Sequence, residues 1–220
     1  MPRIGLIRVL TTEDAQLLQT HGRLIMERFP SLQVTSRCIP DHPSGVHNEA
    51  TERSAAPLVA ALAAEFEKEG YDAVIVSCAG DPGVEEARRQ VRIPVIGAGR
   101  ACAAVARGLG DKLGAMGITP DIPEAMRAVL GDALVAYVQP PGVHTTLDLM
   151  TPAGAAALDE AAQELKARGI DAVALACTGM STIGAARRIA KTTGLMVVDP
   201  VMSEALLALE AVQLAAWTRN

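Results

Sequence analysis

The chain has 220 residues, of which half are hydrophobic and only 2% are aromatic, and its formal net charge is −5 at pH 7. This length suits one large or two small domains, with a core that must be built from Ala, Val, Leu and Ile. An acidic chain without a basic cluster is not expected to bind nucleic acid or an anionic membrane, and the scarcity of aromatic rings leaves no platform for base stacking. No stretch approaches the roughly 20 apolar residues of a transmembrane helix.

The first residues enter a strand directly, without the long apolar run and cleavage site of a signal peptide, which predicts a cytoplasmic protein. The four cysteines, Cys38, Cys78, Cys102 and Cys177, are therefore expected to be reduced thiols. They form no C-x-x-C pair and no His/Cys cluster at zinc spacing, so no structural metal is expected.

Short apolar runs rich in β-branched residues alternate with longer helical patterns, which is typical of βα units around parallel sheets. Strands are predicted, in chain order, at residues 4–9, 32–39, 73–77, 94–97, 113–118, 134–138, 172–176 and 196–199. Several of these runs are continuously apolar, as expected when helices cover both faces of a sheet.

The helices between these strands carry end signals. Asp121 is predicted to cap a helix over 124–130. Pro57 lies inside an otherwise helical pattern, so the segment 48–69 is predicted to be kinked or to begin later than its pattern suggests. The last helix, 202–217, has an apolar face that would fit either half of the protein.

Two segments of the chain are near copies of each other. GYDAVIVSCAG occupies residues 70–80 and GIDAVALACTG occupies 169–179, so Cys78 and Cys177 hold the same place in each, at an offset of 99 residues. A repeat of this kind closes on itself about a two-fold axis, and two equivalent thiols then face each other across one cleft.

The repeat predicts an α/β fold of two similar Rossmann-like domains with parallel sheets, related by pseudo-two-fold symmetry, with the active site in the cleft between them. We expect residues 1–97 and the C-terminal helix 202–220 to form the first half, and residues 98–201 to form the second.

Each of the two repeated cysteines ends a buried strand and precedes a Gly-containing turn, at the edge of a parallel sheet where ligands bind. A helix N-terminus there favours thiolate over thiol, which predicts that the pKa of each thiol moves from about 8.5 toward neutrality. A free cysteine is usually a small core hydrophobe, but two at equivalent strand ends indicate function. The pair suits chemistry that needs a base on one side of a carbon and an acid on the other. Cys38 and Cys102 have no such partner and are interpreted as structural.

Backbone N–H groups of the turns after these cysteines can hold a carboxylate or a developing enolate oxygen, and polar side chains of neighbouring loops can bind a substrate anion. The predicted substrate-binding residues are Ala79, Gly80, Asp81, Thr178, Gly179, Arg8, Thr11 and Thr119. For Asp81 and Ser181, a role as helix caps alone is an equally good interpretation. The polar loop 41–49 is interpreted as a lid or a source of further contacts, and His144 belongs to the mirrored loop.

The chain resembles the cofactor-independent Asp/Glu/hydantoin racemase family, and within it the hydantoin racemases most closely. The resemblance spans nearly the whole chain and rests on CAGDPG at 78–83, ACTGM at 176–180 and VVDPV at 197–201. Glutamate racemases typically have C-N-T and C-T-H at the two cysteines, and here Gly179 replaces that histidine. The turn after the first strand, RVLTT at 8–12, departs from the asparagine-rich turn usual in hydantoin racemases.

The resemblance implies an isomerase that inverts a carbon next to a carbonyl without a cofactor. Its substrate would be a hydantoin or a related amino-acid derivative with a carboxylate or imide group. One of Cys78 and Cys177, as thiolate, would remove the proton, and the other, as thiol, would return one from the opposite face. An amino-acid racemase of the Asp/Glu type and a maleate-type cis–trans isomerase are alternatives within the superfamily. A non-catalytic, two-lobed protein that binds a small molecule is the alternative from another class. A symmetric homo-oligomer is expected.

Overall fold

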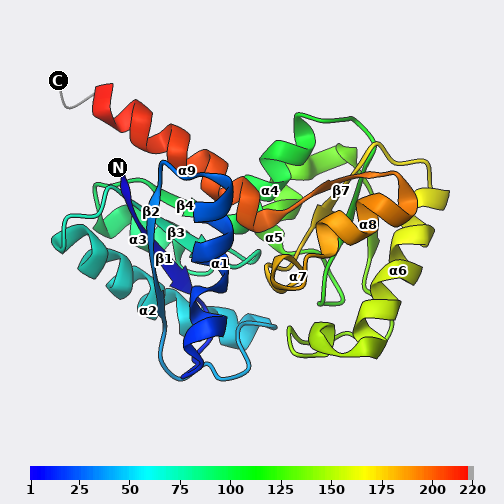
Figure 1. Cartoon of the computed structure of the whole chain (residues 1–220), viewed down its shortest axis with the longest axis horizontal. Helices are drawn as coiled ribbons and strands as arrows, with labels where there is room; N and C mark the ends of the chain where they lie inside the picture. The colour runs from blue at the N-terminus through cyan, green and yellow to red at the C-terminus, as the bar shows by residue number, and fades with distance from the viewer. Residues whose placement is uncertain (218–220) are drawn as a thin grey trace.

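The computed structural model describes residues 1–217, which form two α/β halves lying side by side (Figure 1). The first half of the chain contains β1 (Arg3–Arg8), α1 (Ala15–Arg28), β2 (Gln33–Cys38), α2 (Glu49–Lys68), β3 (Ala73–Ser77), α3 (Val84–Gln90), β4 (Val95–Gly97) and α4 (Ala98–Arg107). The second contains β5 (Leu113–Met116), α5 (Glu124–Leu130), η1 (Gly131–Ala133), β6 (Leu134–Val138), η2 (Asp148–Met150), α6 (Pro152–Ala167), β7 (Ala172–Leu175), α7 (Gly179–Thr182), α8 (Ala185–Thr193), β8 (Met196–Val198) and α9 (Pro200–Trp217). All eight predicted strands are present within these residues.

Each half has one parallel four-stranded sheet, and the two sheets have the same strand order. The first runs β2-β1-β3-β4 and the second β6-β5-β7-β8. The central strands are buried on both faces, which explains their continuous apolar sequences. The predicted fold class, two similar Rossmann-like α/β domains, is confirmed.

Helices cover both faces of each sheet. In the first half, α2 and α3 pack on one face, and α1 and α9 pack on the other. In the second half, α6 and α8 pack on one face, and α4 and α5 pack on the other. The apolar side chains in these layers are mostly Ala, Val, Leu and Ile, as the composition required.

The last helix of each repeat crosses to the opposite half. Helix α4 follows the strands of the first half but packs on α5, β7 and β8 of the second. Helix α9 follows the strands of the second half but packs on α1, β3 and β4 of the first, as Figure 1 shows. On this packing we propose the division into 1–97 with 202–220, and 98–201; residues 218–220 lie outside the described part.

The aspartate of the repeated segment has the same structural role in both halves. Asp72 Oδ2 accepts a hydrogen bond from the Arg3 backbone N–H at 2.8 Å, and Asp171 Oδ2 accepts one from the Lys112 backbone N–H at 2.9 Å. Each bond fixes the chain at the start of the first strand of its half. The repeated Gly-x-Asp pattern therefore reflects the fold rather than the chemistry.

One predicted helix cap is wrong. The residue that caps α5 is Pro123, and no side chain, including that of Asp121, makes a capping hydrogen bond there. Helix α2 contains Pro57 and begins at Glu49, so the later start is not seen; Asn48 and Thr51 form a reciprocal capping box at that start.

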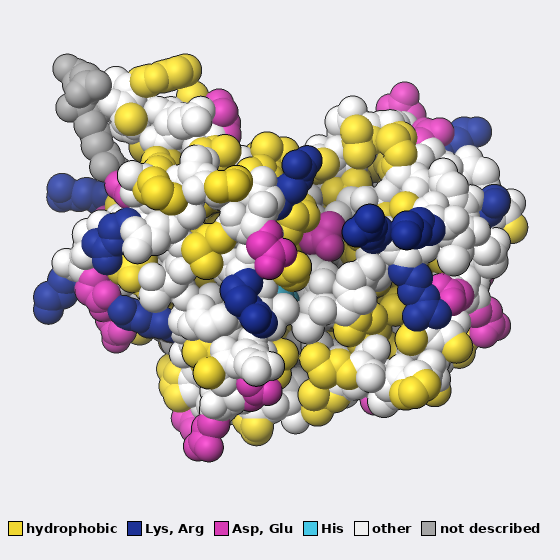
Figure 2. All heavy atoms as spheres, in the orientation of Figure 1, with side chains coloured by type: hydrophobic (Ala, Val, Ile, Leu, Met, Phe, Trp, Pro, Cys, Tyr) yellow, Lys and Arg dark blue, Asp and Glu magenta, His cyan; other side chains and the backbone are white. Residues whose placement is uncertain are grey.

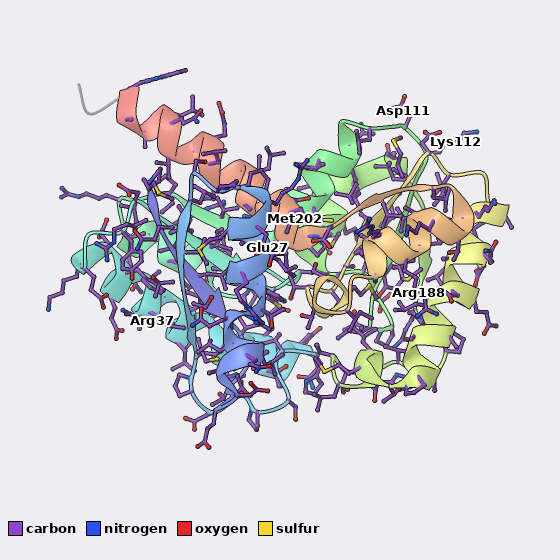
Figure 3. All side chains as sticks on the ribbon, viewed as in Figure 1. Glu27, Arg37, Asp111, Lys112, Arg188 and Met202 are labelled. Carbon is purple, nitrogen blue, oxygen red and sulfur yellow. The ribbon has the colours of Figure 1, made fainter. Side chains whose placement is uncertain are left out.

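The face of the molecule seen in Figure 2 carries Lys and Arg side chains interspersed with Asp and Glu over both halves. Several of these form ion pairs, such as those of Arg37 with Glu69 and Arg188 with Asp159; both arginines are labelled in Figure 3. Partly exposed pairs of this kind contribute little to stability. Among residues 1–217, no helix combines the length and the apolar character needed to cross a bilayer.

Candidate active site

One cleft of about 570 Å³ receives both repeated cysteines. Cys78 follows β3 directly, and Cys177 follows β7 after one residue, so each lies at the carboxyl end of a central parallel strand. Because the cleft is lined by residues of both halves, the two thiols approach it from opposite domains. All four cysteines of the chain are unpaired.

Backbone N–H groups point at both sulfur atoms. The Gly80 N–H faces the Cys78 thiol, and the N–H groups of Gly179 and Met180 face the Cys177 thiol. The Thr146 hydroxyl lies 3.9 Å from Cys177 Sγ as a third polar neighbour. These dipoles stabilise the thiolate form of each cysteine.

Burial nevertheless raises the pKa of both thiols above the ordinary cysteine value. The predicted shift toward neutrality is wrong, because desolvation outweighs the backbone N–H groups. The helices that follow do not reverse this: α7 has only four residues, and α3 begins six residues after Cys78. The charge of Cys177 also raises the pKa of Cys78, so the titrations of the two thiols are coupled.

Eight of the ten predicted site residues line the cleft, and two do not. Those in the lining are Cys78, Cys177, Ala79, Gly80, Thr178, Gly179, Arg8 and Thr119. Thr11 lies outside it, where its hydroxyl donates to the Ile39 carbonyl at 2.7 Å and accepts the His42 N–H at 2.8 Å. This threonine fixes the loop 41–49 onto the end of β1 instead of contacting the cleft.

Asp81 is the second residue that lies outside the cleft. Its buried carboxylate accepts the backbone N–H groups of Gly99 at 2.7 Å and Arg100 at 2.9 Å, which are the first free donors of α4. The cap interpretation is therefore the one that the geometry supports. In the second half Asp199 caps α9 in the same way, through Val201 and Met202, and the Ser181 hydroxyl donates to it at 2.8 Å.

The polar side chains predicted to bind an anion are already engaged with the protein. Arg8 donates to the carbonyls of Leu17 and Leu18, at 2.7 and 3.3 Å, and its side chain is buried against α1. The hydroxyl of Thr119 donates to the Asp121 carbonyl at 2.6 Å, and that of Thr178 donates to a carbonyl as well. These groups shape the cleft, and a substrate oxygen would have to be bound mainly by backbone N–H groups.

A scan against protein families matches residues 4–208 to the model described as Asp/Glu/Hydantoin racemase. The chain belongs to the Asp/Glu/hydantoin racemase family. The homologues of this chain are named racemases, and racemases are isomerases. Two curated relatives are similar to the chain over most of its length.

The curated relatives are both hydantoin racemases. The one from Rhizobium meliloti is 28% identical over 183 residues, covering 76% of this chain and 73% of the relative. The one from Paenarthrobacter aurescens is 26% identical over 156 residues, covering 63% of this chain and 62% of the relative.

Solved structures of racemases share the fold. Allantoin racemase from Klebsiella pneumoniae superposes with a TM-score of 0.84 at 22% identity, covering 98% of this chain and 89% of the other. Glutamate racemase isoform RacE1 from Bacillus anthracis superposes with a TM-score of 0.71 at 15% identity, covering 97% and 82%.

Sequence reasoning missed several residues that line the cleft of this racemase-family chain. Thr146 and Glu52 are the clearest. The Thr146 hydroxyl contacts Cys177, and the charge of Glu52 raises the pKa of Cys78. The repeat offers a signal for the first, because the offset of 99 pairs Thr146 with His47, and both line the cleft. The loop 41–49 contributes residues 45–49 to the lining, whereas His144 is not part of the lining and contacts Gln139.

Proposed function

We propose that this chain is a cofactor-independent hydantoin racemase that inverts the carbon next to a carbonyl by a two-base mechanism. The observation that carries the proposal is the placement of Cys78 and Cys177 at equivalent strand ends, on the walls of one cleft and from opposite halves. One thiolate removes the proton while the opposite thiol returns another, and the two exchange roles for the other enantiomer. The two curated relatives, both hydantoin racemases, support the choice of substrate.

The charges around the cleft favour a neutral imide over a dicarboxylic acid. Both arginines in the lining are engaged: Arg8 with backbone carbonyls, and Arg127 with Glu124 at 3.9 Å. Glu52 and Asp121 also line the cleft, and within residues 1–217 neither carboxylate has a hydrogen bond or ion pair. A free carboxylate on the substrate would meet negative charge without a matching cation, which argues against aspartate, glutamate or maleate.

A substrate screen tests this proposal. Purified protein is incubated with single enantiomers of 5-isopropylhydantoin, allantoin, aspartate and glutamate, and separately with maleate. We expect the optical rotation of a cyclic imide to decay to zero and the amino acids and maleate to remain unchanged. Racemisation of aspartate or glutamate without any effect on the hydantoins would overturn the proposed substrate. Tight binding of a hydantoin without turnover would support a non-catalytic binding protein instead. A cytoplasmic location and a homo-oligomeric assembly stay predictions.

A further inference from the structure

A buried chain of hydrogen bonds lies behind the two cysteines, and the proposed proton transfers do not use it. Ser77 Oγ lies 2.7 Å from Glu204 Oε1, His21 Nδ1 lies 2.8 Å from Ser77 Oγ, and His21 Nε2 lies 3.0 Å from Thr182 Oγ1. Glu204 and His21 are fully buried, and Ser77 is 2% exposed. We refer to these four residues as the Glu204–Thr182 chain.

The Glu204–Thr182 chain joins the two strand ends that carry the thiols. Ser77 is the residue immediately before Cys78, and Thr182 lies in α7, the short helix after Cys177. A further bond, from the Thr178 hydroxyl to the Ser77 carbonyl at 3.2 Å, runs in parallel with it. The other members come from α1 and α9, which pack against each other; Figure 3 labels Glu27 on α1 and Met202 on α9.

The protons of the chain can be arranged without any net charge. Burial raises the pKa of Glu204 well above its ordinary value and lowers that of His21 well below its ordinary value, so burial favours the neutral form of both side chains. The Ser77 hydroxyl donates to Glu204 Oε1, and His21 Nδ1–H donates to Ser77 Oγ. His21 Nε2 is left to accept from the Thr182 hydroxyl. Each link has one donor and one acceptor.

Stability alone does not explain a carboxyl at this place. Glu204 Oε2 is buried and has no hydrogen-bond partner among the described residues, which costs free energy that an apolar side chain would avoid. The neighbours of Glu204 on α9 include Val201, Ala205 and Ala208, which are buried in the apolar core. A leucine at position 204 would match that surface, so packing does not account for the carboxyl, which bonds Ser77 and interacts with the charge of the buried Arg8.

We propose that the Glu204–Thr182 chain is a positioning device that fixes the separation of the two thiols across the cleft. This inference rests on the proposed racemase function. With the separation fixed, the thiol on the far side protonates the planar intermediate before the first cysteine returns the proton it took. If the separation loosens, the first thiolate still removes the proton, but the opposite thiol is misplaced, and a shift of about 1 Å is enough to slow such a transfer about 100-fold.

The test measures exchange and inversion separately. L-5-isopropylhydantoin is incubated in D2O, and the deuterium in recovered L-substrate is compared with the amount of D-product, after subtraction of the enzyme-free reaction. We expect Thr182→Val and Glu204→Leu to raise the ratio of exchange to inversion by at least about fivefold, because proton removal survives and delivery fails. Glu204→Gln keeps a hydrogen-bonding group beside Ser77 and should stay near the wild-type ratio.

Ser203→Ala is the matched control, because Ser203 is a buried neighbour on α9 whose hydroxyl, among residues 1–217, bonds only the Asp199 carbonyl, at 2.8 Å. Partial unfolding lowers exchange and inversion equally and leaves their ratio unchanged. Thr182→Val replaces a hydroxyl by a methyl group of equal size. If Glu204→Leu fails to fold, the ratio of exchange to inversion is therefore measured on Thr182→Val. An unchanged ratio in a folded, active Thr182→Val protein overturns the inference, and so does an equal rise in Ser203→Ala. A wild-type protein without either reaction contradicts the proposed function instead.

Discussion

Replacement of either Cys78 or Cys177 by alanine is expected to lower racemisation in both directions by about 10³-fold or more, because each direction needs one cysteine as base and the other as acid. The two thiols line the same cleft from opposite halves, at equivalent ends of the two central strands. Loss of either one therefore interrupts both directions. The measurement is the initial rate of inversion for each enantiomer of 5-isopropylhydantoin.

Cys38→Ala is the matched control for these variants. Cys38 is a half-buried free thiol at the end of β2, outside the lining of the cleft. We expect it to keep the wild-type rate. If Cys78→Ala or Cys177→Ala, shown to be folded by circular dichroism, also keeps that rate, the two-base mechanism is wrong.

The second large effect concerns stability and its dependence on pH. The buried carboxyl of Asp81 holds the first N–H groups of α4, the helix that crosses to the other half. Asp81→Ala leaves these two donors without their partner, and each such loss costs roughly 1–3 kcal/mol. At pH 5 we expect the free energy of unfolding to fall by about 3 kcal/mol. The Asp81 N–H also bonds the Cys78 carbonyl at 3.0 Å, so the turn that carries Cys78 should loosen as well.

Asp81→Asn isolates the pH dependence. Burial raises the pKa of Asp81 to about 6 in the folded protein, above the ordinary value of 3.8. The folded state therefore keeps this proton over a range in which the unfolded chain has lost it, and the stabilisation is present below pH 3.8 and lost as the pH rises through 6. We expect the stability difference between wild type and Asp81→Asn to shift by up to about 3 kcal/mol in favour of the variant between pH 4 and pH 7. Denaturant unfolding of both proteins at several pH values measures this difference in the free energy of unfolding. If the difference stays constant, or shifts in favour of wild type as the pH rises, the carboxyl is not buried as described.

The strands and the two cysteine positions were predictable because their signals are local. Val74, Ile75 and Val76 form a continuous apolar run that only a strand buried on both faces explains, and the copy at 172–175 repeats it. The duplication was enough to predict that Cys78 and Cys177 lie at equivalent strand ends, because this prediction needs no tertiary contacts.

The side chains of α4 and α9 give no local signal for the half on which each helix packs, because small and aliphatic apolar side chains fit either sheet equally well. The role of Asp81 followed from the crossing of α4, since the helix it caps begins 17 residues further along the chain. Arg8 was placed at the correct edge of the sheet, but the direction of its side chain depends on the Leu17 and Leu18 carbonyls in the first turn of α1.

The Glu204–Thr182 chain could not be predicted from sequence patterns, because its members are far apart in the sequence. Its partners are 56, 127 and 161 residues apart along the chain. One buried histidine on α1 and one buried glutamate on α9 carry no spacing signal, and only the packing of these helices against each other brings them behind the cleft.

The central claim, that two thiols act on opposite faces of one carbon, is tested most directly by the fate of the substrate hydrogen in the wild-type protein. One enantiomer of 5-isopropylhydantoin is converted to a low extent in D2O. The two enantiomers are then separated, and the deuterium content of each is measured by mass spectrometry. The account predicts deuterium in nearly all of the product enantiomer and in almost none of the recovered substrate, after correction for the enzyme-free reaction. Equal deuterium in the two enantiomers from the earliest times would show that one base serves both faces, and would contradict the account.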